Sequence, residues 1–188
     1  ITSDLRFYLQ DGAHLKIDGG SFTTTDTGAG TDYNVHTVGT YGEPSTLEVS
    51  HGGRLTAPFM FWIVGHNAAG AIFGDGGIID IGDKPIYLSN NNGGPATLAL
   101  TNATLTCSSI DFGYAASRGA AQTMVLKDTL VNLSRFVFRH KTDESTILFD
   151  GATLVPKAAS ASFLPAGLPT PTLGAGGLTV SNAFDVTA

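Results

Sequence analysis

The sequence is poor in cysteine, in charged residues and in long hydrophobic runs, and each shortage excludes a class of protein. A single cysteine, Cys107, rules out an internal disulfide framework. Ten basic residues against 16 acidic ones give a net charge of −6, which argues against a nucleic-acid partner. The longest apolar run, residues 57–64, is too short to span a membrane as a helix. The five histidines show no metal-ligand spacing, so we predict neither a metal nor a cofactor.

Glycine, in contrast, is abundant and is concentrated in short turn motifs. The chain contains 24 glycines, many of them in pairs, as in "DGG" at 18–20 and 75–77 and "HGG" at 51–53. Gly, Asn and Asp tolerate the left-handed backbone conformations that tight corners require. With 188 residues, of which 42% are hydrophobic, the chain is long enough for one domain with a substantial core. No stretch shows helical periodicity with caps, which excludes folds that alternate strands and helices.

Short stretches of alternating apolar residues recur along the chain with a period of about 25 residues. Leu47 and Val49 alternate with polar residues, and this period of two predicts β-strands. Each stretch ends on an apolar residue just before a turn motif. The residues in that position are Ile17, Val49, Phe73, Leu100, Leu126, Phe149 and Leu173.

Two further sets of residues recur in step with these stretches. A threonine stands three residues before the final apolar residue in several repeats, which predicts an outward ladder of Thr46, Thr97, Thr123 and Thr146. A second apolar set predicts another sheet with an internal stack of aromatic rings. Its members are Phe59/Phe61, Ile86/Leu88, Ile110/Phe112, Phe136/Phe138, Phe163 and Phe184. Cys107 alternates with Leu105 and is expected to be a small core residue.

These patterns predict an all-β protein, a right-handed parallel β-helix (β-solenoid) of about seven coils with roughly 25 residues each. We expect residues 1–188 to form a single β-helix domain. Neither terminus shows a polar, helix-forming cap, so we expect this domain to be a segment of a longer secreted or surface protein. The interior should contain a set of residues that are nearly inaccessible to solvent: Leu47, Val49, Leu98, Leu100, Met124, Leu126, Ile147 and Phe149.

The stretch "LGAGGLTVSNAFDVT" (173–187) resembles the glycine-rich line repeated in autotransporter-associated β-strand-repeat proteins. "FGDGGIIDIG" (73–82) and "FDGATLV" (149–155) are similar to variants of that line. The resemblance implies a passenger-type parallel β-helix that is secreted by, or displayed on, a Gram-negative-type bacterium. It favours a non-catalytic structural or adhesin-like segment with an extracellular or cell-surface location. The partners that we expect are a surface glycan or neighbouring β-helix segments.

The alternative is a carbohydrate-binding or carbohydrate-active β-helix, similar to polysaccharide lyases, glycoside hydrolases or phage tailspikes. Hydrolysis requires two facing carboxylates, and the acidic candidates are Asp75, Asp80, Asp83 and Asp111. Asp80 and Asp111 are expected to point outward, but from different sheets. The chain lacks the Asn-Thr-Asp, Asp-Asp and Gly-His-Gly motifs of polygalacturonase-type hydrolases. We therefore predict no catalytic residue and leave the enzyme class open.

The run "APFMFWIVGHN" (57–67) predicts an apolar outer surface. If Phe59 points inward and the alternation holds, Trp62 points outward, and its exposed row needs a cover or a partner. A sugar-binding site there would combine stacking rings with polar groups. Its members would be Trp62, Tyr87, Asp111, Arg135 and Arg139. The rival interpretation, which we favour, is that the long loop 23–44 packs over Trp62 and that Arg135 and Arg139, with His140 and Lys141, form an ordinary solvated face.

Overall fold

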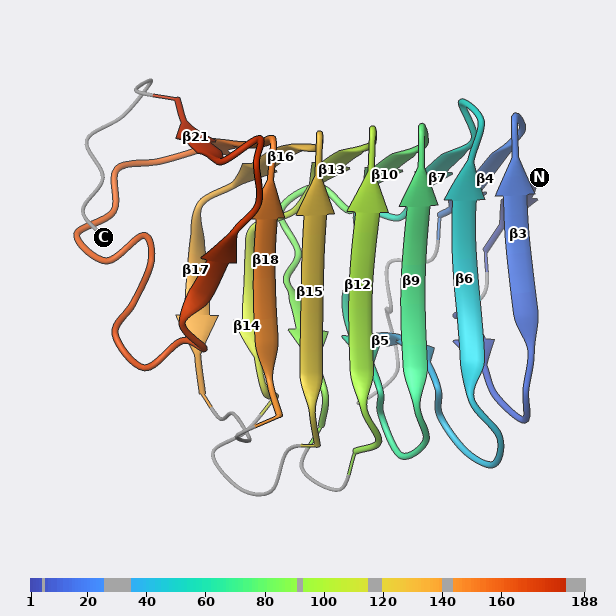
Figure 1. The fold of residues 1–188 in the computed structure, drawn as a ribbon. Coiled ribbons are helices and arrows are strands. Elements are labelled where there is room, and N and C mark those ends of the chain that lie inside the picture. Colours follow the sequence, from blue (N-terminus) through green and yellow to red (C-terminus); the bar gives the residue numbers. More distant parts are fainter. Residues whose placement is uncertain (5, 26–34, 91–92, 115–119, 140–143, 182–188) are drawn as a thin grey trace.

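In the computed structural model, the chain forms an all-β, right-handed parallel β-helix of about six turns. Figure 1 shows the strands stacked side by side along one axis, from blue β3 (His14–Asp18) to orange β18 (Thr146–Asp150). The described residues form strands, turns and connecting segments without a helix, so in them no helix is long and apolar enough to cross a membrane. The structure describes residues 1–4, 6–25, 35–90, 93–114, 120–139 and 144–181.

Within the described residues, three parallel sheets run along the solenoid, and consecutive strands of the chain belong to different sheets. The seven-stranded sheet consists of β3 (His14–Asp18), β6 (Ser45–Ser50), β9 (Gly70–Asp75), β12 (Ala96–Thr101), β15 (Gln122–Lys127), β18 (Thr146–Asp150) and β20 (Pro171–Leu173). The eight-stranded sheet consists of β1 (Thr2–Ser3), β4 (Ser21–Thr24), β7 (Arg54–Thr56), β10 (Ile78–Asp80), β13 (Thr104–Thr106), β16 (Leu130–Leu133), β19 (Ala152–Pro156) and β21 (Leu178–Val180). The six-stranded sheet consists of β2 (Tyr8–Leu9), β5 (Val35–Val38), β8 (Phe61–Val64), β11 (Ile86–Leu88), β14 (Ser109–Phe112) and β17 (Arg135–Phe138).

The turn count and the sheet count differ from the sequence-based expectation. The structure has about six turns instead of seven, because seven stacked strands bound six complete turns between them. Each turn also crosses a third sheet, the eight-stranded one. Its strands are short and follow directly after the turn motif, as β7 does after residues 51–53, so their alternation spans too few residues to stand out in the sequence.

The interior predicted from the alternation is confirmed. Leu98 and Leu100 on β12 are fully buried and lie beside Met124 and Leu126 on β15 in a parallel register. Every residue predicted to line this interior has at most 2% of its surface exposed. The outward threonine ladder is confirmed for Thr97, Thr123 and Thr146, which are neighbours in register. Ala71 separates Thr46 from Thr97. One alternating pattern therefore sets both faces of the seven-stranded sheet.

The third repeat is shifted by one residue relative to our prediction. Gly74, and not Phe73, takes the inner position between Val49 and Leu100. Phe73 points outward and is 41% exposed. A Cβ atom at Gly74 would lie 2.8 Å from Leu100 Cδ2, so the tightly packed interior favours glycine there. Leu173 has the predicted register with Phe149, although it is 61% exposed in the last strand of its sheet.

The variable turn motifs share one backbone conformation. At the corner that follows the seven-stranded sheet, at least one residue in each turn has a positive φ, whatever its type. Backbone N–H groups at this corner donate to carbonyls of the next turn, for example from Asn102 to Lys127 at 3.0 Å. The corner therefore selects residues that tolerate the left-handed region. They are Gly19, His51 with Gly52, Gly76, Asn102, Asp128, Gly151 and Gly177.

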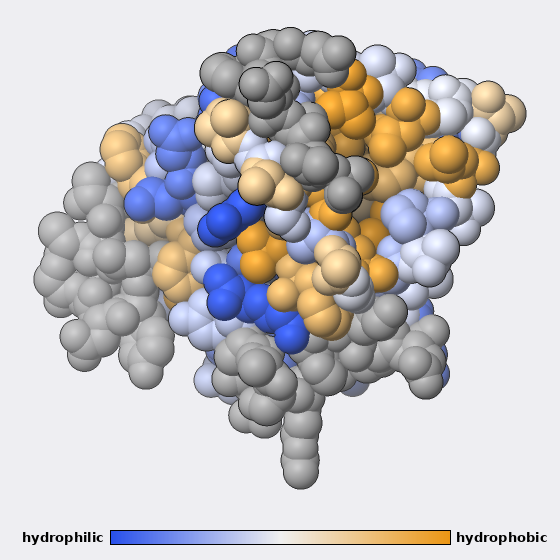
Figure 2. Space-filling model, turned by 90° about the vertical axis from the view of Figure 1, so that its left-hand side faces the viewer, coloured by the Kyte–Doolittle hydropathy of each residue, from blue (hydrophilic) through white to orange (hydrophobic). Residues whose placement is uncertain are grey.

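The core continues along the axis and reaches the surface at one end. Cys107 is fully buried beside Leu105, as predicted, and burial raises the pKa of its thiol. Figure 2 looks onto the end of the solenoid that carries the last strands and shows hydrophobic atoms at the surface there. Leu178 and Val180 of β21 pack against the core and remain half-buried. The last described turn thus offers apolar surface next to polar residues.

Candidate functional site

The structure places Trp62 inside the solenoid, which corrects the outward orientation predicted from alternation. Its side chain is 1% exposed, and Met60 and Val64 are fully buried as well. Phe59 is 44% exposed instead, and Phe61 is half-buried on the outer face. The alternation was assigned one residue out of phase because every residue from Phe59 to Val64 is apolar, so the run itself contains no polar residue that fixes the phase.

Among the described residues, those of the long loop 23–44 do not lie over the outside of Trp62 as the predicted cover; they form part of the sheet and, through His36, part of the interior around the ring. Val35–Val38 form β5, which pairs edge to edge with β8 within the six-stranded sheet. Trp62 is enclosed by inward-facing rings, with its centroid 4.9 Å from His36 and 5.8 Å from Phe7. The middle of the loop, including Tyr33, lies outside the described residues. The Trp62 side chain is therefore part of the core, and it is not available to a ligand.

Three other aromatic rings gather on the outer face of the six-stranded sheet. Phe61 and Tyr87 lie edge to face with their centroids 5.5 Å apart, and Tyr114 stacks on Phe61 at 5.9 Å with an interplanar angle of 13°. Tyr87 and Tyr114 are also in edge contact, at 4.9 Å. Tyr114 is 38% exposed. We call these three residues the aromatic cluster. It occupies the outer position that the sequence analysis assigned to Trp62.

Asp111 and Arg139 extend this cluster with charge. Asp111 lies directly beside Tyr87 in the sheet register, as predicted, and Arg139 Nε donates to Asp111 Oδ2 at 3.3 Å. The guanidinium carbon of Arg139 is 5.9 Å from the ring centroid of Tyr87. Asp111 is only 2% exposed, and its burial raises the pKa of the carboxyl, although hydrogen bonds from Ser109 and Arg139 oppose the shift. Tyr87, Asp111 and Arg139 are thus brought together.

Arg135 projects from the neighbouring strand and is exposed. It pairs in register with Ser109, and it lines an open depression of about 300 Å³ on the outer surface. Ser108 and Ser134 line the same depression, and their backbones are joined by a Ser134 N–H to Ser108 carbonyl bond of 2.8 Å. The predicted ligand residues other than Trp62 therefore lie on one face: Tyr87, Asp111 and Arg135 on adjacent strands, and Arg139 just beyond the end of β17. His140 and Lys141 lie outside the described residues.

Sequence reasoning missed Phe61, Tyr114 and the two serines. Phe61 would have been found by moving the alternation of residues 59–64 by one residue. Tyr114 follows β14 in a connecting segment, where no strand period applies, and the serines stand at a corner between sheets. Only the three-dimensional structure shows that these residues are neighbours, because successive turns of a solenoid place residues about 25 positions apart beside each other.

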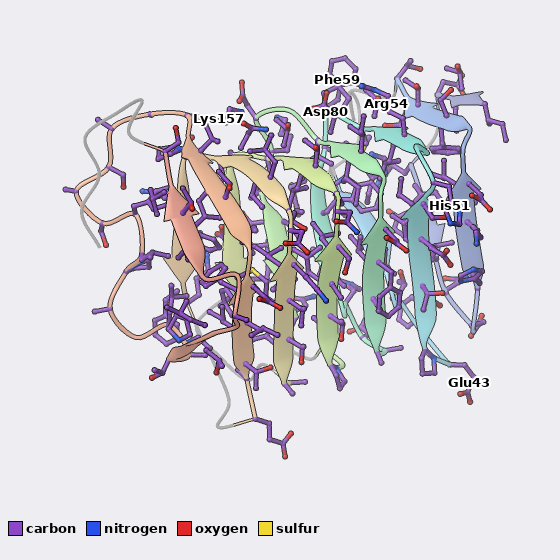
Figure 3. All side chains as sticks on the ribbon, turned by 45° about the horizontal axis from the view of Figure 1, so that its top comes forward. Glu43, His51, Arg54, Phe59, Asp80 and Lys157 are labelled. Atoms are coloured by element: carbon purple, nitrogen blue, oxygen red, sulfur yellow. The ribbon has the colours of Figure 1, made fainter. Side chains whose placement is uncertain are left out.

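The other acidic candidates do not meet Asp111. Asp80 lies on the eight-stranded sheet, where Arg54 Nη2 contacts its Oδ2 at 3.4 Å, and Figure 3 shows these two side chains close together. Asp83 forms an ion pair with Lys157, which Figure 3 shows farther along the rod. Each of these carboxylates has its own basic partner. The described part of the chain thus provides no facing carboxylate pair of the kind that glycoside hydrolysis uses.

No metal site emerges from the histidines and acids that the structure describes. No group of three or more His, Cys, Asp or Glu side chains among these residues could hold a metal ion. His51 contacts Asp18 at 2.7 Å, and His66 contacts Asn90 at 2.8 Å. His36 is fully buried, and its Nδ1 accepts a hydrogen bond from the Phe7 N–H.

The raised pKa of Asp111 leads to a pH-dependent stability prediction. Between the ordinary carboxyl value of 3.8 and its raised folded-state value, Asp111 holds more protons in the folded protein than in the unfolded chain. Its contribution to stability therefore falls as the pH rises through this window. We expect Asp111→Asn, which resembles the neutral acid, to be at least as stable as the wild type at pH 7, with the difference disappearing below pH 3.8. Urea denaturation across this pH range measures it.

Asp80→Asn serves as the matched control, because Asp80 is a partly exposed member of an ion pair on another sheet. It should change the stability at pH 7 by no more than about 1 kcal/mol. An Asp111→Asn protein that is clearly less stable than the wild type at pH 7 would contradict this prediction. It would show that the ion pair with Arg139 stabilises the protein by more than burial of the Asp111 charge costs.

The chain was also compared with known proteins. No protein family, no curated protein and no solved structure matches it.

Proposed function

We propose that this protein is a non-catalytic, adhesin-like β-helix segment of a bacterial surface or secreted protein, and that it binds a glycan with the outer face of its six-stranded sheet. The observation that carries this proposal is the aromatic cluster of Phe61, Tyr87 and Tyr114 on that face. Further β-helix segments would stack on the last described turn, where Leu178 and Val180 are half-buried. The segment would act as a rigid rod that displays the binding face outside the cell.

The chemistry of the cluster suits a sugar. Aromatic rings present an apolar face for the C–H groups of a pyranose, and tyrosine adds a hydroxyl at the edge of that face. Arg139 lies against Tyr87 and offers N–H donors to sugar hydroxyls. At the other end of the sheet, Tyr8 and Tyr41 line an open depression of about 640 Å³. Binding groups therefore run along the rod axis, as an extended oligosaccharide requires.

The strands hold this surface in a fixed arrangement. Tyr87 lies between Ile63 and Asp111 in a continuous parallel register, and the residues that flank it in the strand, Ile86 and Leu88, are anchored in the core. A preordered face loses little conformational entropy when a ligand binds. The rigidity of the solenoid thus supports recognition as well as a structural role.

Tyr87→Ala tests the glycan-binding proposal. We expect the wild-type protein to bind at least one oligosaccharide on a glycan array, and the variant to bind it about tenfold more weakly, which corresponds to about 1.4 kcal/mol. Because Tyr87 is only half-buried on the outer face, the variant should fold normally, and its melting curve verifies this.

Phe73→Ala is the matched control, since Phe73 is a partly exposed aromatic residue on the seven-stranded sheet. It should bind the array like the wild type. A wild-type protein that retains no glycan, or a Tyr87→Ala protein with unchanged binding, would contradict the proposal.

A carbohydrate-active enzyme is the second candidate, because Asp111 is a buried carboxyl with a raised pKa beside an arginine. Such a group can donate a proton to a glycosidic oxygen. The described strands of this sheet carry no second carboxylate, which favours binding over cleavage. If the bound oligosaccharide is shortened during incubation, and Asp111→Asn prevents the shortening, the enzyme replaces the adhesin as the function.

A further inference from the structure

Arg135 differs from the other basic residues near the proposed glycan site in having no acidic partner. Lys157 pairs with Asp83, and Arg139 pairs with Asp111. No salt bridge or hydrogen bond joins the Arg135 guanidinium to another described residue, and its side chain is exposed. Its charge acts on Asp111 from a distance and opposes the rise in the pKa of that carboxyl that burial causes. Arg135 therefore presents a positive charge that belongs to no ion pair among the described residues, on a protein whose net charge is −6.

Hydroxyl groups surround this charge. The depression of about 300 Å³ beside Arg135 is lined by Ser108, Ser109, Ser134, Arg135, Ala159 and Ser160. The Ser109 hydroxyl donates to Asp111 Oδ1. Within the part of the chain that the structure describes, the Ser108 and Ser134 hydroxyls make no hydrogen bond and are free to donate. A guanidinium with two free hydroxyls is a donor set that suits an oxyanion, because it has no competing carboxylate of its own.

A second depression, of about 210 Å³, is also lined by Arg135, together with Phe136, Val137, Phe138, Ser162 and Pro165. Arg135 thus lines two hollows. Its guanidinium can reach a ligand in either of them, and its planar fork can bind two oxygens of one carboxylate or sulfate group.

The distance to the aromatic cluster suits one oligosaccharide. Arg135 pairs with Ser109 on β14, and the same strand pairs Asp111 with Tyr87. Tyr87 and Arg135 are therefore two strands apart and offset by two residues along the strand, because Val137 is the residue in register with Asp111. The usual strand spacing and rise per residue place their Cα atoms about 12 Å apart. A sugar on the aromatic cluster would place the next units of its chain over Arg135.

We propose that the glycan is anionic, and that Arg135, together with the hydroxyls of Ser108 and Ser134, binds a carboxylate or sulfate group of the sugar. This inference rests on the glycan-binding function proposed above and names its ligand class. The aromatic cluster supplies contact with the sugar ring, whichever sugar it is. Arg135 supplies the preference for charge. Because the chain as a whole is acidic, an anionic glycan is attracted to this face and repelled elsewhere.

The test compares three probes of equal length, namely trigalacturonate, its fully methyl-esterified form and a sulfated galactose trisaccharide. Titration calorimetry with the wild-type protein should show that at least one anionic probe binds on the order of tenfold more tightly than the neutral methyl ester. The two anionic probes distinguish a carboxylate from a sulfate site. Binding of the preferred probe should weaken with added salt.

Arg135→Gln should remove the preference, so that charged and neutral probes bind with equal affinity. Tyr87→Ala should weaken all probes in parallel. Arg54→Gln, a change of the same chemistry on the eight-stranded sheet, is the control and should leave the preference intact. Arg135 is exposed, so folding of its variant is not at risk, and a melting curve verifies this.

The outcomes separate the two proposals. If the wild-type protein binds the neutral and anionic probes equally in a Tyr87-dependent manner, or if Arg135→Gln keeps the preference, the anionic-glycan inference is overturned and glycan binding stands. If the wild-type protein binds none of the probes and no sugar on the array, both are overturned.

Discussion

A Leu126→Asp protein is expected not to fold. Leu126 is fully buried and lies between Leu100 and Phe149 in the inner stack of the seven-stranded sheet. An unpaired carboxylate in this position costs several kcal/mol, and a domain of this kind has only about 5–15 kcal/mol of stability in total. Because each turn rests on the next, the loss should disrupt the stack beyond one strand. Circular dichroism should show loss of the β-sheet signal, without a cooperative melting transition.

Thr123→Asp introduces the same side chain on the outer face of the same strand, where Thr123 is half-buried in the threonine ladder. This control should fold, with a change in stability within about 1 kcal/mol. A Leu126→Asp protein that melts like the wild type would refute the inner orientation of this strand, and with it the register of the seven-stranded sheet.

The fold could be predicted wherever apolar and polar residues alternate. In "TLALT" (97–101) the polar and small positions fix which face is buried, since shifting the strand by one residue would expose both leucines. The period of about 25 residues then stacks equivalent strands, which demands a parallel solenoid rather than hairpins. The changing turn residues carried less information, because His51, Asn102 and Asp128 all adopt the same left-handed corner.

Prediction failed where apolar and polar residues do not alternate. Residues 59–64 are all apolar, so the sequence alone cannot decide whether Phe61 or Trp62 faces the core. Phe73 was placed inward for a related reason, because the inner residue of that repeat is Gly74 and has no side chain to reveal its position. In both cases the decision comes from packing between turns. Trp62 fits in the core beside His36 and Phe7, and no property of the local sequence predicts that contact.

The candidate site could be predicted only where its residues lie on strands with a clear alternation. Tyr87 and Asp111 are one repeat apart on clear strands, so their adjacency follows from the solenoid. Arg139 reaches Asp111 from beyond the end of β17, and Tyr114 reaches Phe61 from a connecting segment. Connecting segments have no repeating pattern, and their side-chain positions depend on the path of the chain.

Trp62→Ala is expected to lower the free energy of unfolding by about 3–5 kcal/mol, the usual cost of removing a large aromatic side chain from a core. The ring is 1% exposed and contacts His36 and Phe7 at centroid distances of 4.9 and 5.8 Å. Since Trp62 is the sole tryptophan, unfolding should be followed by circular dichroism in urea. Phe59→Ala, at a 44% exposed position, is the control and should cost no more than about 1 kcal/mol.

Trp62→Phe separates the volume of the ring from its polar atom. Trp62 Nε1 is buried and has no hydrogen-bond partner among the described residues, and such an unsatisfied group costs about 1–3 kcal/mol. Phenylalanine removes this cost while retaining most of the packing, so it should destabilise the protein far less than alanine does. Glycan binding should survive in Trp62→Phe, because the aromatic cluster and Arg135 lie on the opposite face of the sheet. A Trp62→Ala protein with wild-type stability and lost glycan binding would instead contradict the buried position and show that Trp62 is an exposed ligand-binding residue.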